Sequence, residues 1–274
     1  MIRRLLARYH AAAAAAARQS GDTDRAAWHC ERALRIDPRL EAVHNMLEKL
    51  FLHGEEYVAL LARIHQHLRP RTYVEIGIET GMSVRLALPH TRVLGVDPEP
   101  RISAPLPANV RVYAETSDAF FSRVDVRAEL GGLPVDLAFI DGMHHFEFAL
   151  RDFMALERLC SPRSTILLHD CFPHDRRTAQ RERQVAFWTG DVWRLIVLLK
   201  RHRPDLSIHT VATPPSGLAI VRGLDPGSSV IADNFDRLCA ELMALDYGYL
   251  EKGRAAKLNL FPNDWPQVVS LLPA

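Results

Sequence analysis

The chain has 274 residues, of which 48% are hydrophobic and 24% are charged, a composition that argues against a disordered or fibrous protein. Its 34 Lys and Arg residues almost balance its 33 Asp and Glu residues, and the formal net charge of +1 argues against a general nucleic-acid binder, which needs many cations to neutralise phosphates. Four cysteines lie far apart with no CxxC pair, so the sequence predicts no disulfide framework and favours a reducing, cytoplasmic location.

The first 20 residues have features of both a signal peptide and a helix. Basic and leucine residues at positions 3–6 precede seven alanines at positions 11–17, but Arg8 and His10 interrupt the apolar stretch. Because alanine has the highest helix propensity, we predict a cytoplasmic helix here. No apolar run reaches the roughly 18–20 residues of a bilayer-crossing helix, so we expect no membrane span and no membrane partner.

Helices are predicted throughout residues 1–70. Gly21, Pro38 and Gly54 separate them, and the last helix, from about residue 55 to 68, ends before Pro70. Residues 26–38 resemble the second helix and exit turn of a tetratricopeptide repeat, although a single unit cannot bury its own apolar face. We therefore predict an N-terminal helical segment (1–70) that packs on its neighbour, with a plain helical hairpin that binds no partner as the alternative.

From residue 71 the sequence alternates between strand and helix. Seven β-rich runs lie at residues 73–76, 92–96, 110–113, 135–140, 165–168, 206–211 and 218–221, and helical segments lie at 82–88, 118–130, 146–160 and 192–203. This alternation predicts an α/β domain (71–223) with a doubly wound, mostly parallel seven-stranded sheet, whose ligands sit at the carboxyl ends of the strands. Residues 224–274 are predicted to be a helical and irregular extension, with a helix around 231–245, that packs on the domain or contributes to a homodimer contact.

The loop after the first predicted strand indicates a ligand-binding turn. Gly77 and Gly81 let the backbone turn tightly before a helix, whose first N–H groups are free to bind a ligand. Glu79 stands where a GxGxxG motif has its middle glycine, and an acid there disfavours a pyrophosphate, which weakens the alternative of a nucleotide-dependent oxidoreductase. Asp97 ends the second strand, where a carboxylate can accept hydrogen bonds from both ribose hydroxyls. Together these residues predict an adenosine-type ligand without a pyrophosphate.

Several blocks of the sequence resemble the class I S-adenosylmethionine-dependent methyltransferases. Residues 75–83 with Asp97 are similar to the first two motifs of that class. Residues 135–147 (VDLAFIDGMHHFE) resemble the FIDGxHxYE signature of its methyltransferase-24 group, and residues 116–121 and 166–171 fit the same group. The resemblance covers roughly residues 71–223 and implies a Rossmann-like fold with S-adenosylmethionine as cofactor. It does not imply a particular acceptor.

The same resemblance implies which residues bind the cofactor. They are Glu75, Gly77, Gly81, Ser83, Asp97, Ser117, Asp118 and Asp141. Glu75 and the two glycines would shape the methionine pocket, Asp97 would hold the ribose, and Ser117 and Asp118 would lie near the adenine. Taken singly, Gly77, Gly81 and Asp97 have structural alternatives. The glycines can form a bare strand-to-helix turn, and Asp97 can be a helix cap or a turn acid.

A second group of polar residues follows the fourth and fifth predicted strands. Asp141 and Asp170 end strands that are neighbours in such a sheet, and two buried carboxylates need a cation or an imidazolium beside them. Related metal-dependent O-methyltransferases bind a divalent cation at such positions, which implies Asp141, His169 and Asp170 as ligands of Mg or Mn; a histidine ligand also admits iron or zinc. His144, with Asp141, is the candidate catalytic base. The alternatives are that Asp141 orients His144 and that His169 and Asp170 form a hydrogen-bonded pair without metal.

Two later segments bear on the acceptor. The segment 176–203 contains eight Lys and Arg residues but only two acids. This excess predicts either a solvated charged surface or a lid that attracts an anionic acceptor. The turn at residues 213–217 lacks the acid that relatives often carry there. We predict a methyltransferase, with transfer to a hydroxyl of a small-molecule or carbohydrate-like acceptor. The alternatives are an oxidoreductase or a non-catalytic interaction protein on a methyltransferase scaffold.

Overall fold

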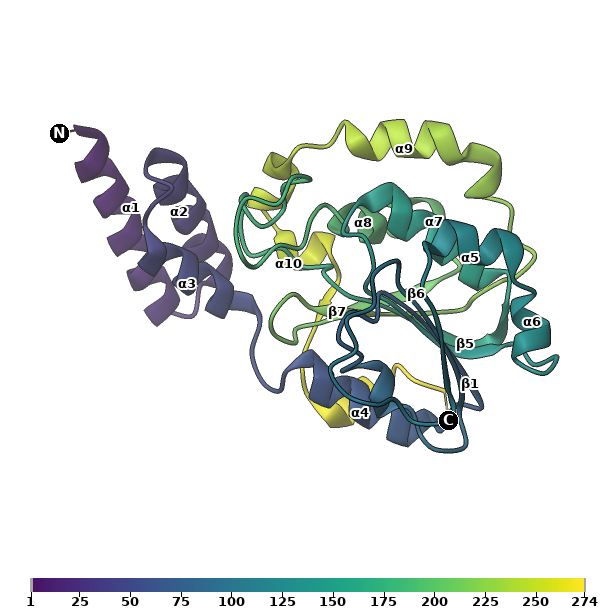
Figure 1. Ribbon diagram of the computed structural model, residues 1–274. Coiled ribbons are helices and arrows are strands. Elements are labelled where there is room, and N and C mark those ends of the chain that lie inside the picture. The colour runs from purple at the N-terminus through teal and green to yellow at the C-terminus, as the bar shows by residue number, and fades with distance from the viewer. Residues whose placement is uncertain (1, 274) are drawn as a thin grey trace.

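The computed structural model describes residues 2–273, which form one eight-stranded sheet with helices on both faces (Figure 1). The strands are β1 (Thr72–Ile76), β2 (Arg92–Val96), β3 (Val110–Tyr113), β4 (Val135–Ile140), β5 (Cys160–Leu168), β6 (Ser207–Val211), β7 (Leu218–Arg222) and β8 (Leu260–Phe261). Their order is β3-β2-β1-β4-β5-β7-β6-β8, and only β7 runs antiparallel to its neighbours. The predicted Rossmann-like α/β fold is confirmed. The predicted seven strands are present, and β8 is an eighth that two residues are too few to reveal in a sequence.

Residues 2–68 consist mainly of helices, as predicted. Helices α1 (Ile2–Gln19), α2 (Thr23–Ile36) and α3 (Glu41–Phe51) form a group beside the sheet, while α4 (Tyr57–Leu68) crosses one face of it (Figure 1). Asp22 caps α2 by accepting a hydrogen bond from the Arg25 amide at 3.1 Å, which explains the break after α1. The tetratricopeptide-like character of this segment stays a prediction. Within residues 2–273 no helix is both long and apolar enough to cross a membrane.

The predicted helix 146–160 ends at Glu157, because Cys160 begins β5. The other helices of the chain differ from the prediction at two further places. They are η1 (Val84–Leu86), α5 (Ser117–Arg123), α6 (Val126–Glu129), α7 (Phe146–Glu157), α8 (Trp193–His202), η2 (Ala232–Asn234), α9 (Phe235–Met243), η3 (Tyr247–Glu251), α10 (Arg254–Lys257) and α11 (Trp265–Val269). The predicted helix 82–88 is only the single turn η1, because Pro89 disfavours helical backbone at the residue before it. The predicted helix 118–130 is split, because Asp125 accepts a hydrogen bond from the Ala128 amide and starts α6.

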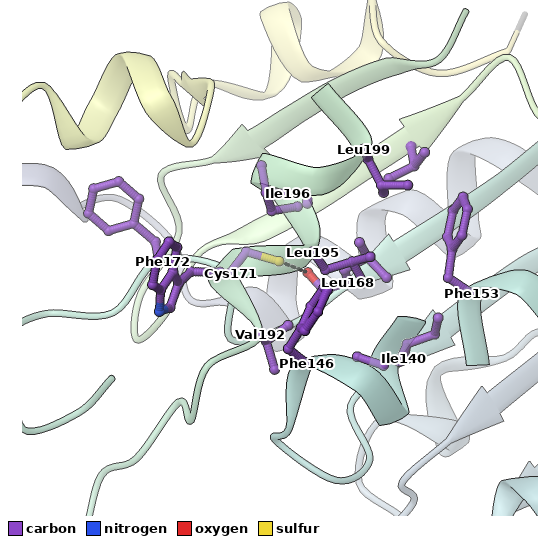
Figure 2. Close-up of a cluster of buried hydrophobic side chains, with 14 of the residues drawn as sticks. Ile140, Phe146, Phe153, Leu168, Cys171, Phe172, Val192, Leu195, Ile196 and Leu199 are labelled. Carbon is purple, nitrogen blue, oxygen red and sulfur yellow. Dashed lines mark hydrogen bonds between the residues drawn. The ribbon is translucent and has the colours of Figure 1, made fainter. Parts of the chain in front are cut away.

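Two apolar layers cover the two faces of the sheet. Alternate residues of β4 face opposite sides, so Leu137 and Phe139 belong to the cluster that contains α4, while Ala138 and Ile140 belong to the cluster that contains α7 and α8. Figure 2 shows the second cluster, in which side chains of α7 and α8 surround Ile140 and Leu168. Because Ile140 and Leu168 are the last residues of β4 and β5, this packing fixes the point from which the two following loops depart.

Candidate functional site

The loops after β1, β2 and β4 meet at one edge of the sheet. The Gly77 amide donates to the Val96 carbonyl at 2.8 Å, and the Asp141 amide donates to the Ile76 carbonyl at 2.8 Å. Gly77 has a φ of 86°, and a Cβ at this residue would lie 2.1 Å from the Asp141 carbonyl oxygen. Only glycine allows this approach. Gly77, Asp97 and Asp141 therefore converge at the carboxyl ends of their strands.

Glu75 and Ser83 bind each other beneath this turn. Both side chains are buried, and Glu75 accepts hydrogen bonds from the Ser83 hydroxyl and, at 2.8 Å, from the Tyr73 hydroxyl. Burial raises the pKa of Glu75 to about 8, although the two hydrogen bonds act in the opposite direction. Since both of its oxygens are engaged within the protein, Glu75 supports the shape of the turn from below.

Asp97 clamps the first turn to the end of β2. One carboxylate oxygen accepts from the Glu79 amide at 2.9 Å and the other from the Glu99 amide at 2.8 Å. Asp97 is thus a turn acid, the structural alternative, and each of its oxygens keeps a second lone pair for a ribose hydroxyl. Met82, in the turn after β1, and Met143, in the loop after β4, are 51% and 53% exposed. These features fit an adenosyl cofactor.

Ser117 and Asp118 lie at the start of α5, after β3. The Asp118 carboxylate forms two hydrogen bonds of 3.0 Å with the Arg151 guanidinium of α7. The Ser117 hydroxyl bonds to Asp152, whose pKa burial raises to about 7 despite that bond. Both side chains therefore join α5 to α7, and their role near the adenine stays a prediction.

Two carboxylates and two imidazoles gather at the ends of β4 and β5, which are parallel neighbours, as predicted. His169 Nδ1 lies 3.0 Å from Asp141 Oδ1, and His144 Nε2 lies 3.0 Å from Asp170 Oδ2. Asp170 has a φ of 56°, a left-handed conformation that is rare for residues other than glycine. With this backbone conformation directly after β5, the Asp170 carboxylate reaches His144 in the cluster.

His169 and Asp170 stabilise each other in their charged forms. Burial alone would lower the pKa of His169, but the charges of Asp141 and Asp170 outweigh it and raise the pKa to about 10. Burial alone would raise the pKa of Asp170, but His169 and His144 lower it to about 2. His169 is thus an imidazolium, which donates from Nδ1 to Asp141 and from Nε2 to the Ser216 hydroxyl oxygen at 3.2 Å. Both of its nitrogens are occupied within the protein.

The loop after β5 holds His144 in one tautomer. His144 Nδ1 lies 2.9 Å from the Trp188 carbonyl oxygen, which can only accept, so Nδ1 carries a hydrogen. The Trp188 indole stacks on the same imidazole, with ring centroids 5.0 Å apart. An unprotonated Nε2 would repel the Asp170 oxygen 3.0 Å away, so this position suits a proton or a metal ion between the two atoms.

The loop also crosses the backbone of His144. The Asp191 amide donates to the His144 carbonyl oxygen at 3.1 Å. Gly190 has a φ of 59°, and a Cβ there would lie 1.7 Å from that oxygen. The crossing therefore requires glycine at position 190.

The donor atoms that could hold a metal differ from the predicted set. One ligand atom each of Asp141, His144 and Asp170 lies within 4.8 Å of the others, beside a hollow of about 10 Å³, the size of one water molecule or ion. The sequence analysis implied His169 where the structure brings His144. His169 is unsuited because Asp141 and Ser216 already occupy its two ring nitrogens.

Three residues of this cluster were missed by the sequence analysis. Tyr57 of α4 stacks on His169 with ring centroids 4.1 Å apart, and burial together with the charges of Asp141 and Asp170 raises its pKa. Ser216 lies in the turn 213–217, which the sequence analysis set aside because the expected acid is absent. Trp188 belongs to a loop with no regular pattern. Two positions carried a usable signal: Ser216 by its place in the last hairpin, and Trp188 because residues 188–193 (WTGDVW) resemble the same methyltransferase group.

Several arginines of the basic segment 176–203 are paired with acids, some from other parts of the chain and one, Asp191, from the segment itself. Arg181 pairs with Glu147 and Asp191, Arg194 pairs with Asp191, and Arg203 pairs with Glu157. These guanidiniums join elements of the fold. The local charge excess that suggested a lid for an anionic acceptor is therefore mostly absent from the surface.

The parallel strands, the glycine turn at the end of β1 and the acid at the end of β2 agree with the Rossmann-like fold of the class I S-adenosylmethionine-dependent methyltransferases. Residues 74–171 match the model of the methyltransferase-24 family, described as a methyltransferase domain. No curated protein sequence matches the chain significantly.

Solved structures with a similar fold include proteins with a bound cofactor. Cofactor-bound Rv0187 from MTB is 18% identical with a TM-score of 0.47, covering 69% of this chain and 91% of the other. The O-methyltransferase TomG from Streptomyces achromogenes, involved in tomaymycin synthesis and in complex with SAM, is 17% identical with a TM-score of 0.43, covering 66% and 95%. An O-methyltransferase from Bacillus cereus, in complex with SAH, is 17% identical with a TM-score of 0.45, covering 68% and 90%.

Proposed function

We propose that this protein transfers a methyl group from S-adenosylmethionine to a hydroxyl of a small-molecule or carbohydrate-like acceptor. The observation that carries the proposal is the position of His144 Nε2, which faces the cluster 3.0 Å from Asp170 while Nδ1 is held by the Trp188 carbonyl. A hydroxyl is a weak nucleophile until it loses its proton, so a fixed imidazole at the acceptor side supports O-methylation.

The residues of the chain divide the work between two sides of the site. S-adenosylmethionine, when bound, supplies a methyl group activated by its sulfonium charge. Gly77 lets the first turn approach the ligand closely, and Asp97 offers free lone pairs to the ribose hydroxyls. On the other side, His144 Nε2 and the Asp170 carboxylate would share between them the proton that the acceptor hydroxyl loses. Trp188 shields that imidazole from water.

The same cluster supports a second mechanism for the same function. Asp141, His144 and Asp170 offer two carboxylates and one imidazole, a donor set that suits Mg or Mn and also admits iron or zinc. A divalent cation held there would lower the pKa of the acceptor hydroxyl. His144 would then be a ligand, because one lone pair cannot bind both a metal and a proton.

The test combines cofactor binding, product analysis and metal removal. We expect calorimetry to detect S-adenosylmethionine binding and no NAD(H) binding, and mass spectrometry of a panel of hydroxylated small molecules and sugars to find O-methyl products. Methylation of nitrogen alone, or NAD(H) binding in place of S-adenosylmethionine, would overturn the proposal. Full turnover in excess chelator selects His144 as base, whereas inactivation that Mg or Mn reverses selects the metal mechanism.

A further inference from the structure

Helix α1 carries an apolar stripe that the rest of the described chain leaves open. Ile2, Leu5, Leu6 and Tyr9 are 81%, 59%, 47% and 63% exposed. Their spacing places them on one side of the helix, over roughly 100° of its circumference. The opposite side is buried, through Ala7, Ala14 and Ala17. The stripe holds four of the eight large apolar side chains that are strongly exposed within residues 2–273.

The charges that α1 itself carries around this stripe have a single sign, and outside the helix Asp37 lies close enough to Arg4 for that arginine to contribute to its lowered pKa. At helical spacing, Arg4 and Arg8 flank one edge of the stripe and Arg3 flanks the other. All three side chains are exposed and form no ion pair with any residue in the described part of the chain. From Ile2 to Gln19 the helix has four arginines and no acid. An occupant of this face must therefore be both apolar and anionic.

We propose that α1 is an interfacial helix that adsorbs to an anionic lipid surface. Its apolar side chains would enter the boundary between headgroups and acyl chains while the flanking arginines bind lipid phosphates. The helix lies at the end of the molecule farthest from the sheet, where a flat surface can reach it (Figure 1). Adsorption needs no membrane span, so it agrees with the helix lengths, although it revises the expectation of no membrane partner.

Two other occupants fit the observations less well. A second copy of α1 would bring arginines against arginines, since the helix has no acid to pair with them. A protein that inserts a side chain needs a concave site, and α1 lines neither the hollow at Asp141 nor the cavity of about 160 Å³ between α2, α3 and the loop after β5. A convex helix face whose own charges are all basic suits a flat anionic surface.

Sedimentation of the full chain with lipid vesicles tests the proposal. We expect binding to vesicles of phosphatidylcholine with about one third phosphatidylglycerol, and binding at least about tenfold weaker to phosphatidylcholine alone or in about 0.5 M salt. The variants Leu5→Ser/Tyr9→Ser and Arg4→Glu/Arg8→Glu should each bind at least about tenfold more weakly. The controls Val230→Ser and Arg237→Glu, which change exposed side chains far along the chain, should bind like the wild type.

Four results would overturn the proposal. They are no vesicle binding, equal binding to neutral vesicles, retention on immobilised polyglutamate as strong as on anionic vesicles, and a dimer in sedimentation velocity that Leu5→Ser/Tyr9→Ser dissociates. The third would assign α1 to an acidic protein, and the fourth would assign it to a second copy. None of these measurements depends on methyl transfer.

Discussion

The two sides of the site are built in different ways. The cofactor side uses residues 75–99, one short stretch whose glycines and acids act through local turns. The acceptor side assembles residues from five separate parts of the chain: α4, the loop after β4, the end of β5, the loop after β5, and the turn between β6 and β7. Local turns fix the positions of the residues on the cofactor side. The residues on the acceptor side are brought together only by packing between distant segments.

The largest difference between the two sides is expected when the imidazole of His144 is removed, because turnover should fall while cofactor affinity stays. We expect His144→Ala to lower kcat by roughly 100- to 10,000-fold, the usual contribution of a positioned base, and to leave S-adenosylmethionine affinity within about twofold. Steady-state kinetics and calorimetry measure the two effects. The matched control is His145→Ala, because His145 Nε2 bonds to the Arg181 carbonyl at 3.0 Å, outside the cluster. An equal loss in both variants would contradict a specific role for His144.

The opposite result is expected on the cofactor side. Asp97→Ala should weaken S-adenosylmethionine binding on the order of 100-fold, because hydrogen bonds from ribose to a charged acceptor are lost. Calorimetry measures the affinity, and circular dichroism verifies that the variant is folded. Glu99→Ala is the control, since that exposed side chain reaches only Arg101, at 3.6 Å. Unchanged affinity in folded Asp97→Ala would remove Asp97 from the cofactor site.

Low pH should lower the stability of the protein through His65, which packs beneath the cofactor side. This residue of α4 is buried against Tyr73, with ring centroids 4.6 Å apart, and burial lowers its pKa from 6.5 to about 4. The unfolded chain therefore binds a proton first, and stability falls as the pH drops from 6.5 toward 4, by about 2 kcal/mol at pH 5. Glu75, with its raised pKa, gives the opposite trend and is common to both proteins. Urea unfolding at pH 7.5 and pH 5 should show a smaller acid loss in His65→Phe than in the wild type; an equal loss would refute the assignment.

The smallest effect is expected at Tyr57. Tyr57→Phe keeps the ring on His169 and removes only the hydroxyl, so we expect the acceptor KM to rise about two- to tenfold, the range of one hydrogen bond. Cofactor affinity should be unchanged. Tyr9→Phe, on the exposed face of α1, is the control. A change confined to S-adenosylmethionine affinity would move Tyr57 to the cofactor side.

The fold and the cofactor turn could be read from the sequence because their signals are local. Seven β-rich runs located the strands, and Gly77 and Asp97 followed from their places at the strand ends. The acceptor cluster could be read only in part. Neighbouring strands explain why Asp141 and Asp170 meet, but adjacency in sequence does not reveal which nitrogens are free. Ser216 and Asp141 occupy those of His169, and a distant carbonyl orients His144. Which ring nitrogens are occupied depends on contacts between residues far apart in the chain.

The crossing of Gly190 over the His144 carbonyl has a mechanical consequence. With the two backbones this close, the covering loop has no room to slide past the proton acceptor. Because the Asp191 amide bonds to the His144 carbonyl oxygen and the chain at Gly190 passes against the same oxygen, a displacement of this loop would break a contact with the backbone that carries the proposed base.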